Sequence, residues 1–279
     1  FHSIIVGATS SVAFLSNSLL LFIIYTTSAD GIGSYRDLLA FFAICNIITT
    51  FGHIFLEGYC HMTEAGFYFF PRTPGPLIGG VSLPSIYCVL FILTYYQVFL
   101  ILAYHFVYRY KTITRLYNSF TDKWRRKHWI TAAIVVYVIY VGCFMTVVAV
   151  GMLPSEETRR LVPPEARELY GVDLTDPHTG FIVLAVRRFD FATNTTYRSA
   201  ESIISITCCM FLFGATAAVI VFCIYKTTSA IKSVDVRITS ATRRMHQQLF
   251  RALLIQTTVP CIFSYTPLAM ILLFGAMTG

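Results

Sequence analysis

The sequence contains very little charge for its length. Only 13% of its 279 residues are Asp, Glu, Lys or Arg, whereas 56% are hydrophobic and the mean hydropathy is +0.66. A water-soluble domain must cover its core with polar side chains, and this composition does not supply enough of them. The chain is therefore predicted to be surrounded by lipid rather than by water.

The residue patterns of enzymes and metal sites are also missing. The eight cysteines are scattered singly apart from one adjacent pair, so they form neither a disulfide framework nor a metal-binding spacing. The histidines considered as ligands are His53, His61, His105 and His128. None has a partner three or four residues away, and no nucleophile motif, phosphate-binding loop or carboxylate pair is present. The sequence predicts no enzyme, no metal and no cofactor.

Six long apolar runs contain no Asp, Glu, Lys or Arg. They cover residues 3–27, 38–56, 84–108, 129–152, 202–225 and 252–279. A helix needs about 20 apolar residues to cross the hydrocarbon core, and a charge at its centre would cost about 2.5 to 3.5 kcal/mol. The pattern predicts an all-α membrane protein, with residues 1–279 forming a single transmembrane domain.

The basic residues indicate which loops face the cytoplasm. The loop from Arg109 to His128 holds seven basic residues and one acid, and the loop from Lys226 to Arg251 holds six basic residues and one acid. The loop at residues 153–201 instead holds six basic and eight acidic residues. Short loops rich in Lys and Arg stay in the cytoplasm, so we expect residues 153–201 outside. The basic residues behind the formal charge of +7 are then expected to face anionic membrane lipids and not nucleic acid.

Three further expectations concern the outer side and the chain ends. Asn194 begins the sequon Asn-Thr-Thr and is predicted to be glycosylated, and the aliphatic stretch 181–186 predicts a short helix or strand. Cys60 and Cys88 are candidates for a disulfide, although the sequence does not set their separation. Phe1 is expected to mark a fragment boundary, and a seventh helix is expected to return the chain to the cytoplasm after residue 279.

Two segments at the cytoplasmic side carry a family resemblance. Residues 105–110, His-Phe-Val-Tyr-Arg-Tyr, resemble the His-Phe-x-Tyr-Arg-Tyr signature of Str-type nematode serpentine chemoreceptors, which are rhodopsin-like G-protein-coupled receptors. Residues 246–253, His-Gln-Gln-Leu-Phe-Arg-Ala-Leu, resemble that family's Gln-x-Gln-Leu-Phe-x-Ala-Leu motif, with His246 in place of the first Gln. Further matches are residues 33–36 (Gly-Ser-Tyr-Arg), His61 and residues 169–173 (Leu-Tyr-Gly-Val-Asp).

The resemblance implies a seven-helix receptor bundle of which six transmembrane helices are present. It also implies a small odorant-like ligand, a heterotrimeric G protein as partner, and the plasma membrane of sensory-neuron cilia as the location. A secondary transporter and a ligand-gated channel are the alternatives. Transporters usually carry buried charges and internal repeats, which are absent from these spans, whereas composition alone leaves the channel open.

Arg109 is the first candidate for coupling to a partner. Its planar, always-charged guanidinium stands at the end of a span, where it can bind carbonyls, a carboxylate or a partner's helix end. The alternative is that Arg109 only anchors the helix by extending to the headgroups. The other residues predicted for G-protein coupling are Tyr108, Tyr110, Arg243, Arg244, Gln248 and Arg251. Tyr108 replaces the acid of many rhodopsin-like receptors, so no ionic lock can form there.

The ligand is expected in the outer half of the bundle. The predicted ligand-binding residues are Tyr87, Phe91 and Tyr95 in the third span, His53 and Glu57 in the second, and Tyr265 in the sixth. A spacing of four residues puts the three aromatic side chains of the third span on one helix face. Such stripes also serve ordinary helix packing, which is the alternative.

Two prolines interrupt the sixth span. Pro260 and Pro267 each remove a backbone hydrogen bond and clash with the preceding turn. The sequence therefore predicts a kinked helix at these positions.

Overall fold

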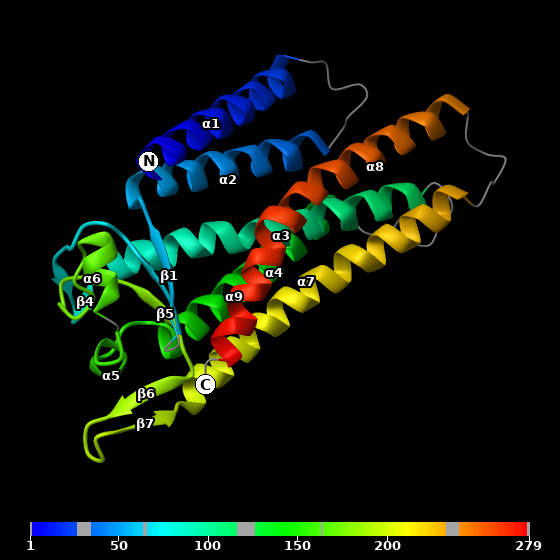
Figure 1. Ribbon diagram of the computed structural model, residues 1–279. Helices are drawn as coiled ribbons and strands as arrows, with labels where there is room; N and C mark the ends of the chain where they lie inside the picture. The colour runs from blue at the N-terminus through cyan, green and yellow to red at the C-terminus, as the bar shows by residue number, and fades with distance from the viewer. Residues whose placement is uncertain are drawn as a thin grey trace. The chain divides into compact units, whose positions relative to one another are not determined.

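Among the described residues, six long stretches of helix dominate the structure (Figure 1). The computed structural model describes residues 2–26, 35–63, 66–115, 126–162, 164–232 and 240–277. The long helices are α1 (His2–Thr26), α2 (Tyr35–Leu56), α3 (Leu83–Arg115), α4 (Arg126–Gly151), α7 (Ala200–Lys232) and α8 (Ser240–Pro260). Beyond α8 the chain passes through a π-helical segment (Cys261–Tyr265) into α9 (Thr266–Met277).

These helices contain six stretches that are long and apolar enough to cross a membrane. The stretches are Ser3–Thr26, Arg36–Leu56, Leu83–Ile113, His128–Gly151, Ala200–Ile231 and Phe250–Ile271. The prediction of a mostly helical membrane protein with six transmembrane helices is confirmed. Helices α3 and α7 continue to Arg115 and Lys232, beyond the predicted ends at 108 and 225, because the charged turns at a helix end remain helical in water and headgroups.

The chain forms two compact units. The first unit comprises Phe1–Tyr96, Cys143–Met210 and Met270–Gly279, and the second comprises Gln97–Gly142 and Phe211–Ala269. The boundary falls inside α3, α4, α7 and α9, so both units contain parts of these helices. A single receptor domain over residues 1–279 stays a prediction.

The first unit contains a three-stranded antiparallel sheet that the sequence did not reveal. Its strands are β1 (Tyr59–Thr63), β2 (Gly66–Phe70) and β5 (Ile182–Leu184), with β2 in the centre. Phe69 pairs with Cys60 on one side and with Ile182 on the other. Gly66 opens β2 with φ 145°, and a side chain there would meet Ala185 at 2.6 Å, so β2 must start with glycine.

The loop after α4 is ordered by short elements, in line with the helix or strand predicted near residues 181–186. It contains α5 (Glu156–Arg159), α6 (Glu165–Tyr170), β5, and the hairpin of β6 (Arg187–Asp190) and β7 (Thr195–Arg198). Ser155 starts α5 with a capping box, and α6 ends at Gly171 in a left-handed conformation. A small hairpin of β3 (Leu77–Ile78) and β4 (Val81–Ser82) precedes α3.

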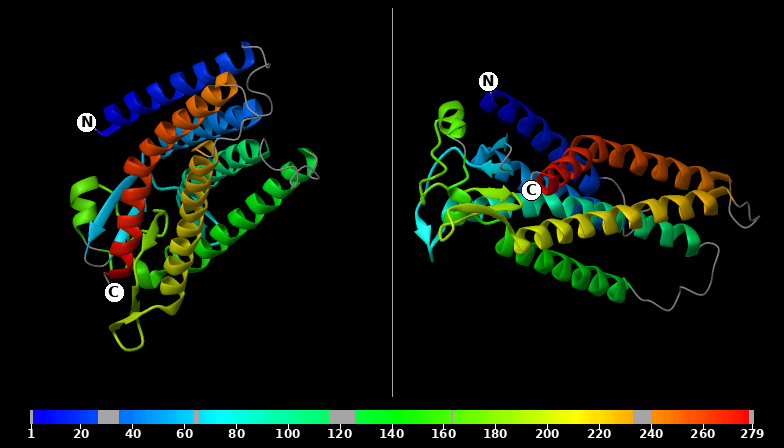
Figure 2. Two further views of the ribbon diagram at one scale, coloured as in Figure 1. Left: turned by 90° about the vertical axis from the view of Figure 1, so that its right-hand side faces the viewer. Right: turned by 60° about the horizontal axis from the view of Figure 1, so that its bottom comes forward.

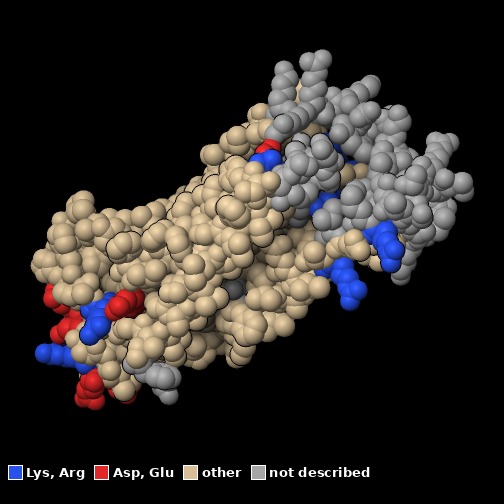
Figure 3. Space-filling view, turned by 90° about the horizontal axis from the view of Figure 1, so that it is seen from above, with Lys and Arg blue, Asp and Glu red and all other residues tan. Residues whose placement is uncertain are grey.

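Both views of Figure 2 show the strands and short helices gathered where α2 ends and where α3 and α7 begin. One face of the sheet and α6 enclose a core of buried residues that includes Tyr68, Phe70 and Phe181. Acidic and basic side chains lie together over this region, whereas the neighbouring long helices are nearly bare of charge (Figure 3). This is the surface expected where loops meet water and helices meet lipid.

Two arginines satisfy the irregular backbone of the first unit. Arg159 donates hydrogen bonds to the carbonyls of Leu174, Asp176, Pro177 and Thr179 at 2.8 to 3.5 Å. Burial lowers the pKa of Arg159, against a smaller opposing effect from Asp176. The guanidinium thus fixes the loop between α6 and β5.

Arg188 on β6 is only 6% exposed and joins several elements. It donates hydrogen bonds to Ser202 Oγ at 3.2 Å, Ser155 Oγ at 3.5 Å and the Gly151 carbonyl at 3.3 Å. Its guanidinium also lies 3.9 Å from the carboxylate of Glu157. The end of α4, the start of α5 and the start of α7 are therefore tied to one side chain.

Candidate functional sites

Arg109 is buried in the second unit. It lies on α3 with 4% of its surface exposed, one turn after the fully buried His105. A buried guanidinium must be compensated by protein groups, because desolvation of a charge is costly. This burial differs from the exposure expected of an anchor that extends to the headgroups.

Aromatic contacts connect the region around Arg109 to two other helices. Phe106 on α3 and Phe250 on α8 meet edge to face, with 6.4 Å between ring centroids. Tyr110 on α3 and Phe222 on α7 form a second edge-to-face pair at 6.2 Å. The two motifs that carry the family resemblance, residues 105–110 and 246–253, are thus in direct contact through Phe106 and Phe250.

Polar contacts hold α3 and α4 together within the same unit. Tyr104 donates a hydrogen bond to the Ala133 carbonyl at 2.7 Å, and Tyr137 donates one to Gln97 Oε1 at 2.6 Å. The ammonium of Lys111 lies 3.4 Å from the centre of the Trp129 ring. Helix α3 therefore contacts α4, α7 and α8 with named side chains.

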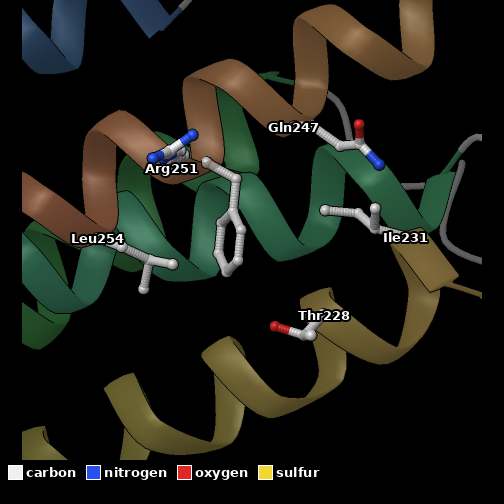
Figure 4. A pocket seen from close by; sticks show the side chains of 6 residues that line it. Thr228, Ile231, Gln247, Arg251 and Leu254 are labelled. Atoms are coloured by element: carbon white, nitrogen blue, oxygen red, sulfur yellow. The ribbon is translucent and has the colours of Figure 1, made fainter.

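A cavity of about 210 Å³ lies between α7 and α8. Its lining residues are Thr228 and Ile231 on α7, and Gln247, Phe250, Arg251 and Leu254 on α8 (Figure 4). Small-molecule sites usually measure about 300 to 1,000 Å³, so this cavity is smaller than most of them. Phe250 lines the cavity and also contacts Phe106, which links the cavity to α3.

The predicted coupling residues share the second unit but differ in exposure. Arg244, Gln248 and Arg251 are exposed, whereas Tyr108 and Tyr110 are half-buried. The side chain of Arg243 lies outside the described residues. Gln247 was missed as a candidate, although its place four residues before Arg251 puts both on one face of α8.

Two of the predicted ligand-binding residues meet in the first unit. The rings of His53 on α2 and Phe91 on α3 are stacked, with centroids 5.7 Å apart and planes 20° apart. Phe69 on β2 stacks on Phe91 with the same separation and angle. Phe69 was not a candidate, because nothing in the local sequence showed that β2 lies against α3.

The other predicted ligand-binding residues are arranged differently. Tyr95 is half-buried on α3, and Tyr87 is 52% exposed. Glu57 follows the end of α2 with φ 40° and forms an ion pair with Arg72 at 3.5 Å. The side chain of Tyr265 lies outside the described residues.

Two resemblance segments far apart in sequence meet beside the sheet. His61 on β1 is 9% exposed, and its ring contacts that of Tyr170 edge to face at 5.5 Å. Tyr170 also donates a hydrogen bond to the Cys60 carbonyl at 3.4 Å. Residues 33 and 34 of another resemblance segment lie outside the described residues, as do the predicted span ends at 27, 278 and 279.

Several groups of the first unit outside the spans have shifted pKa values. Burial raises the pKa of Tyr68 to about 12, because the phenolate would lose its hydration. Hydrogen bonds from the hydroxyl and the amide of Thr175 lower the pKa of Asp173, and Arg167 adds a smaller electrostatic effect in the same direction. The sheet side of this unit therefore favours a neutral Tyr68 and an ionised Asp173 at neutral pH.

The two prolines lie at either side of the π-helical segment. Pro260 is the last residue of α8, and Pro267 is the second residue of α9. The Thr266 amide donates to the Cys261 carbonyl, five residues back. The helix thus changes its hydrogen-bond pattern between the prolines, while a kink stays a prediction.

The structure describes the predicted glycosylation site and the two candidate disulfide cysteines. Asn194 is exposed in the turn between β6 and β7, with φ 54°. Cys60 and Cys88 are free thiols in the structure, and Cys88 Sγ lies 3.9 Å from the Phe69 carbonyl. The glycosylation of Asn194 stays a prediction.

Residues 2–278 match the family described as "serpentine type 7TM GPCR chemoreceptor Str". The G-protein coupled receptor str-33 of Caenorhabditis elegans is 23% identical over 94% of this chain and 74% of its own length. The serpentine receptor class r-10 proteins of Caenorhabditis briggsae and Caenorhabditis elegans are 22% and 25% identical, over 92% and 94% of this chain and 72% and 74% of their own lengths. No solved structure matches the chain.

Proposed function

Because the chain belongs to the Str family of serpentine seven-transmembrane GPCR chemoreceptors, we propose that it binds a small odorant-like ligand in the outer half of its helix bundle and activates a heterotrimeric G protein at its cytoplasmic face. The family and its membrane-spanning helices make the chain a multi-pass membrane protein with a receptor role. The ligand, the partner and the direction across the membrane are the added parts of the proposal.

The observation that carries the proposal is the burial of Arg109 among helix contacts. A ligand can activate a receptor only by favouring one of two helix packings, so some element must have two stable arrangements. Arg109 lies on the helix whose Phe106 and Tyr110 contact α8 and α7. A shift between these helices would change the environment of Arg109, because packed rings move in discrete steps.

The cavity between α7 and α8 supports the binding of a protein partner to the second unit. Gln247 and Arg251 line this cavity, and Arg244 is exposed on the same helix. The last turn of a partner helix carries partial negative charge and free carbonyls, which suit a guanidinium and an amide. This surface therefore fits a helix end of the G protein.

The proposed orientation puts the charged second-unit loops in the cytoplasm and the sheet outside. The exposed turn that carries Asn194 is then accessible to the glycosylation enzyme. We further propose the plasma membrane of a sensory-neuron cilium as the location of the receptor. Labelling with and without membrane permeabilisation tests the orientation, since Asn194 and Arg244 should be reached from opposite sides.

The proposed function is tested by expressing the chain with a Gα reporter and screening small volatile compounds. For an activating compound, Arg109→Ala should reduce the G-protein response by roughly 5- to 150-fold, the usual range of coupling between sites. Binding of the compound should stay within the range of the wild type. The matched control is Arg187→Ala, which removes an exposed arginine of the first unit.

Two outcomes would contradict the proposal in different ways. A response that Arg109→Ala leaves unchanged removes Arg109 from the mechanism. A ligand-dependent ion current in cells without the Gα subunit would favour a ligand-gated channel in place of a G-protein-coupled receptor.

A further inference from the structure

We infer that the ring of Phe69 occupies part of the ligand site. It stacks on Phe91 at the position that a flat aromatic ligand takes when it binds. The inference rests on the proposed ligand binding in the first unit and extends it in two ways. It adds a residue from the sheet to a site otherwise built from helices, and it assigns the ligand to a chemical class.

The geometry of three rings carries the inference. Phe91 is shared by two stacking partners, Phe69 from β2 and His53 from α2, each with 5.7 Å between centroids and 20° between planes. These values lie within the range of offset stacking, the favourable arrangement for two flat rings. Phe69 is 8% exposed, so its ring fills protein space rather than solvent. Phe91 therefore already holds a flat aromatic group.

Two glycines provide the room for these rings. A side chain at Gly58 would meet atoms of the Phe69 ring at 2.7 Å, which is closer than real contacts allow. A side chain at Gly52 would touch Cδ2 of Phe91 at 3.4 Å. Glycine at these two positions thus leaves room for the rings of Phe69 and Phe91 beside α2.

The link between α2 and the sheet can change at low cost. It passes through Glu57, whose φ of 40° is unfavourable for a residue with a side chain. The ion pair between Glu57 and Arg72 is exposed, and such pairs contribute little to stability. Strand β2 is paired with both β1 and β5, so the exchange requires the side chain of Phe69 to turn away while the strand keeps its partners.

The exchange of one ring for another sets the ligand class. A flat aromatic ligand on Phe91 regains the stacking that Phe69 gives up, whereas a saturated ring of the same size does not. His53 is the polar member of the three rings, so a small hydrogen-bonding group on the ligand is favoured. The expected ligands are flat, small aromatic compounds with one such group.

The test uses phenol and cyclohexanol, which differ in flatness and share a hydroxyl. Their affinities are measured by saturation-transfer NMR on the purified chain in lipid nanodiscs. Phe69→Leu should bind phenol about two- to tenfold more tightly than the wild type, because the competing ring is gone. The affinity for cyclohexanol should change less.

Two control pairs separate this result from general damage. Phe55→Leu removes an exposed ring from α2 and should leave both affinities unchanged. Gly58→Ala should displace the Phe69 ring without removing it and so also tighten phenol binding, whereas Gly7→Ala, with nothing within 4 Å, should not. A damaged fold would weaken binding, which is the opposite sign.

Weaker or unchanged phenol binding in Phe69→Leu would overturn the inference, as would the absence of phenol binding in every variant. Neither result touches the proposed function, which is judged by the Gα reporter and its own activating compounds. Conversely, tighter phenol binding in Phe69→Leu would support the inference even if no screened compound activated the Gα reporter, a result that would count against the proposed function alone.

Discussion

The two units are stabilised by different kinds of contact. In the first unit, Arg159 and Arg188 bind backbone carbonyls and hydroxyls that connect short helices and strands. In the second unit, α3 meets α8 and α7 through the edges of aromatic rings, as in Phe106 with Phe250. The first unit thus adds guanidinium hydrogen bonds to its aromatic packing, whereas the contacts of α3 with α7 and α8 in the second unit are made by rings.

The difference follows from where the backbone finds its hydrogen bonds. A long helix satisfies its own amides and carbonyls, so its side chains are free to pack. Short strands and turns leave carbonyls that need other donors when they are buried. Arg159, with four carbonyls as partners, supplies such donors. Irregular segments between membrane helices therefore need a few central polar residues.

The largest expected effect is the loss of Arg188. Arg188→Met should lower the free energy of unfolding by about 3 kcal/mol, because it removes hydrogen bonds from a buried charged donor. Arg187→Met, at the exposed neighbour, should change it little. Unfolding by SDS in mixed micelles measures both values. Equal losses in the two variants would contradict a central role for Arg188.

Loss of an aromatic ring in the second unit should lower the free energy of unfolding somewhat less than loss of Arg188. Phe106→Ala should lower the free energy of unfolding by about 2 to 3 kcal/mol, since packing is lost while lipid already surrounds the helices. The double variant with Phe250→Ala should reveal a coupling of about 1 kcal/mol. Phe263→Ala, at an exposed ring, is the control. Faster hydrogen exchange confined to the first unit would refute the comparison.

A smaller effect of opposite sign is expected at Glu57. Glu57→Gly should raise the free energy of unfolding by about 0.5 to 1 kcal/mol, because glycine adopts a positive φ without strain. Glu57→Gln keeps the strain and removes only the exposed ion pair, so its effect should be close to zero. The comparison by thermal unfolding fails if Glu57→Gly is the less stable variant.

The smallest expected effect is a loss of stability of the first unit at low pH. The pKa of Asp173 is lowered in the folded chain, so its contribution is present above the ordinary pKa of 3.8 and is lost as the pH falls through the folded value. From about pH 5 to about pH 3, the wild type should lose more stability than Asp173→Asn. Parallel melting curves for the two proteins would show that Asp173 does not contribute.

The helices could be predicted from the sequence because their signal is local. Each span is an uninterrupted run without charge, and the motif around Arg109 stands at the end of one such run. The sequence also predicted Phe91 and His53 as ligand-binding candidates; the structure brings their rings together, and their role stays a prediction. These predictions needed only composition and spacing along one helix.

The sheet and its side chains could not be predicted in the same way. Strand β2 pairs with β5, more than 100 residues further on, and this distant pairing helps to fix which side of β2 lies against α3. Short apolar strands carry little periodicity, and their register depends on distant partners. The φ of Glu57 likewise depends on tertiary contacts, since glycine would be the expected residue there.

The π-helical segment between Pro260 and Pro267 affects how the last helix tolerates changes in length. In a regular helix one extra residue would rotate everything beyond it by about 100° around the helix axis, whereas the wider π turn takes up the extra residue. Removing one residue from Cys261–Tyr265 would therefore restore a regular helix and still present the same side chains of α9 to its neighbours. A one-residue gap in relatives at this point would leave the helix face unchanged, and sequence comparisons should allow one here.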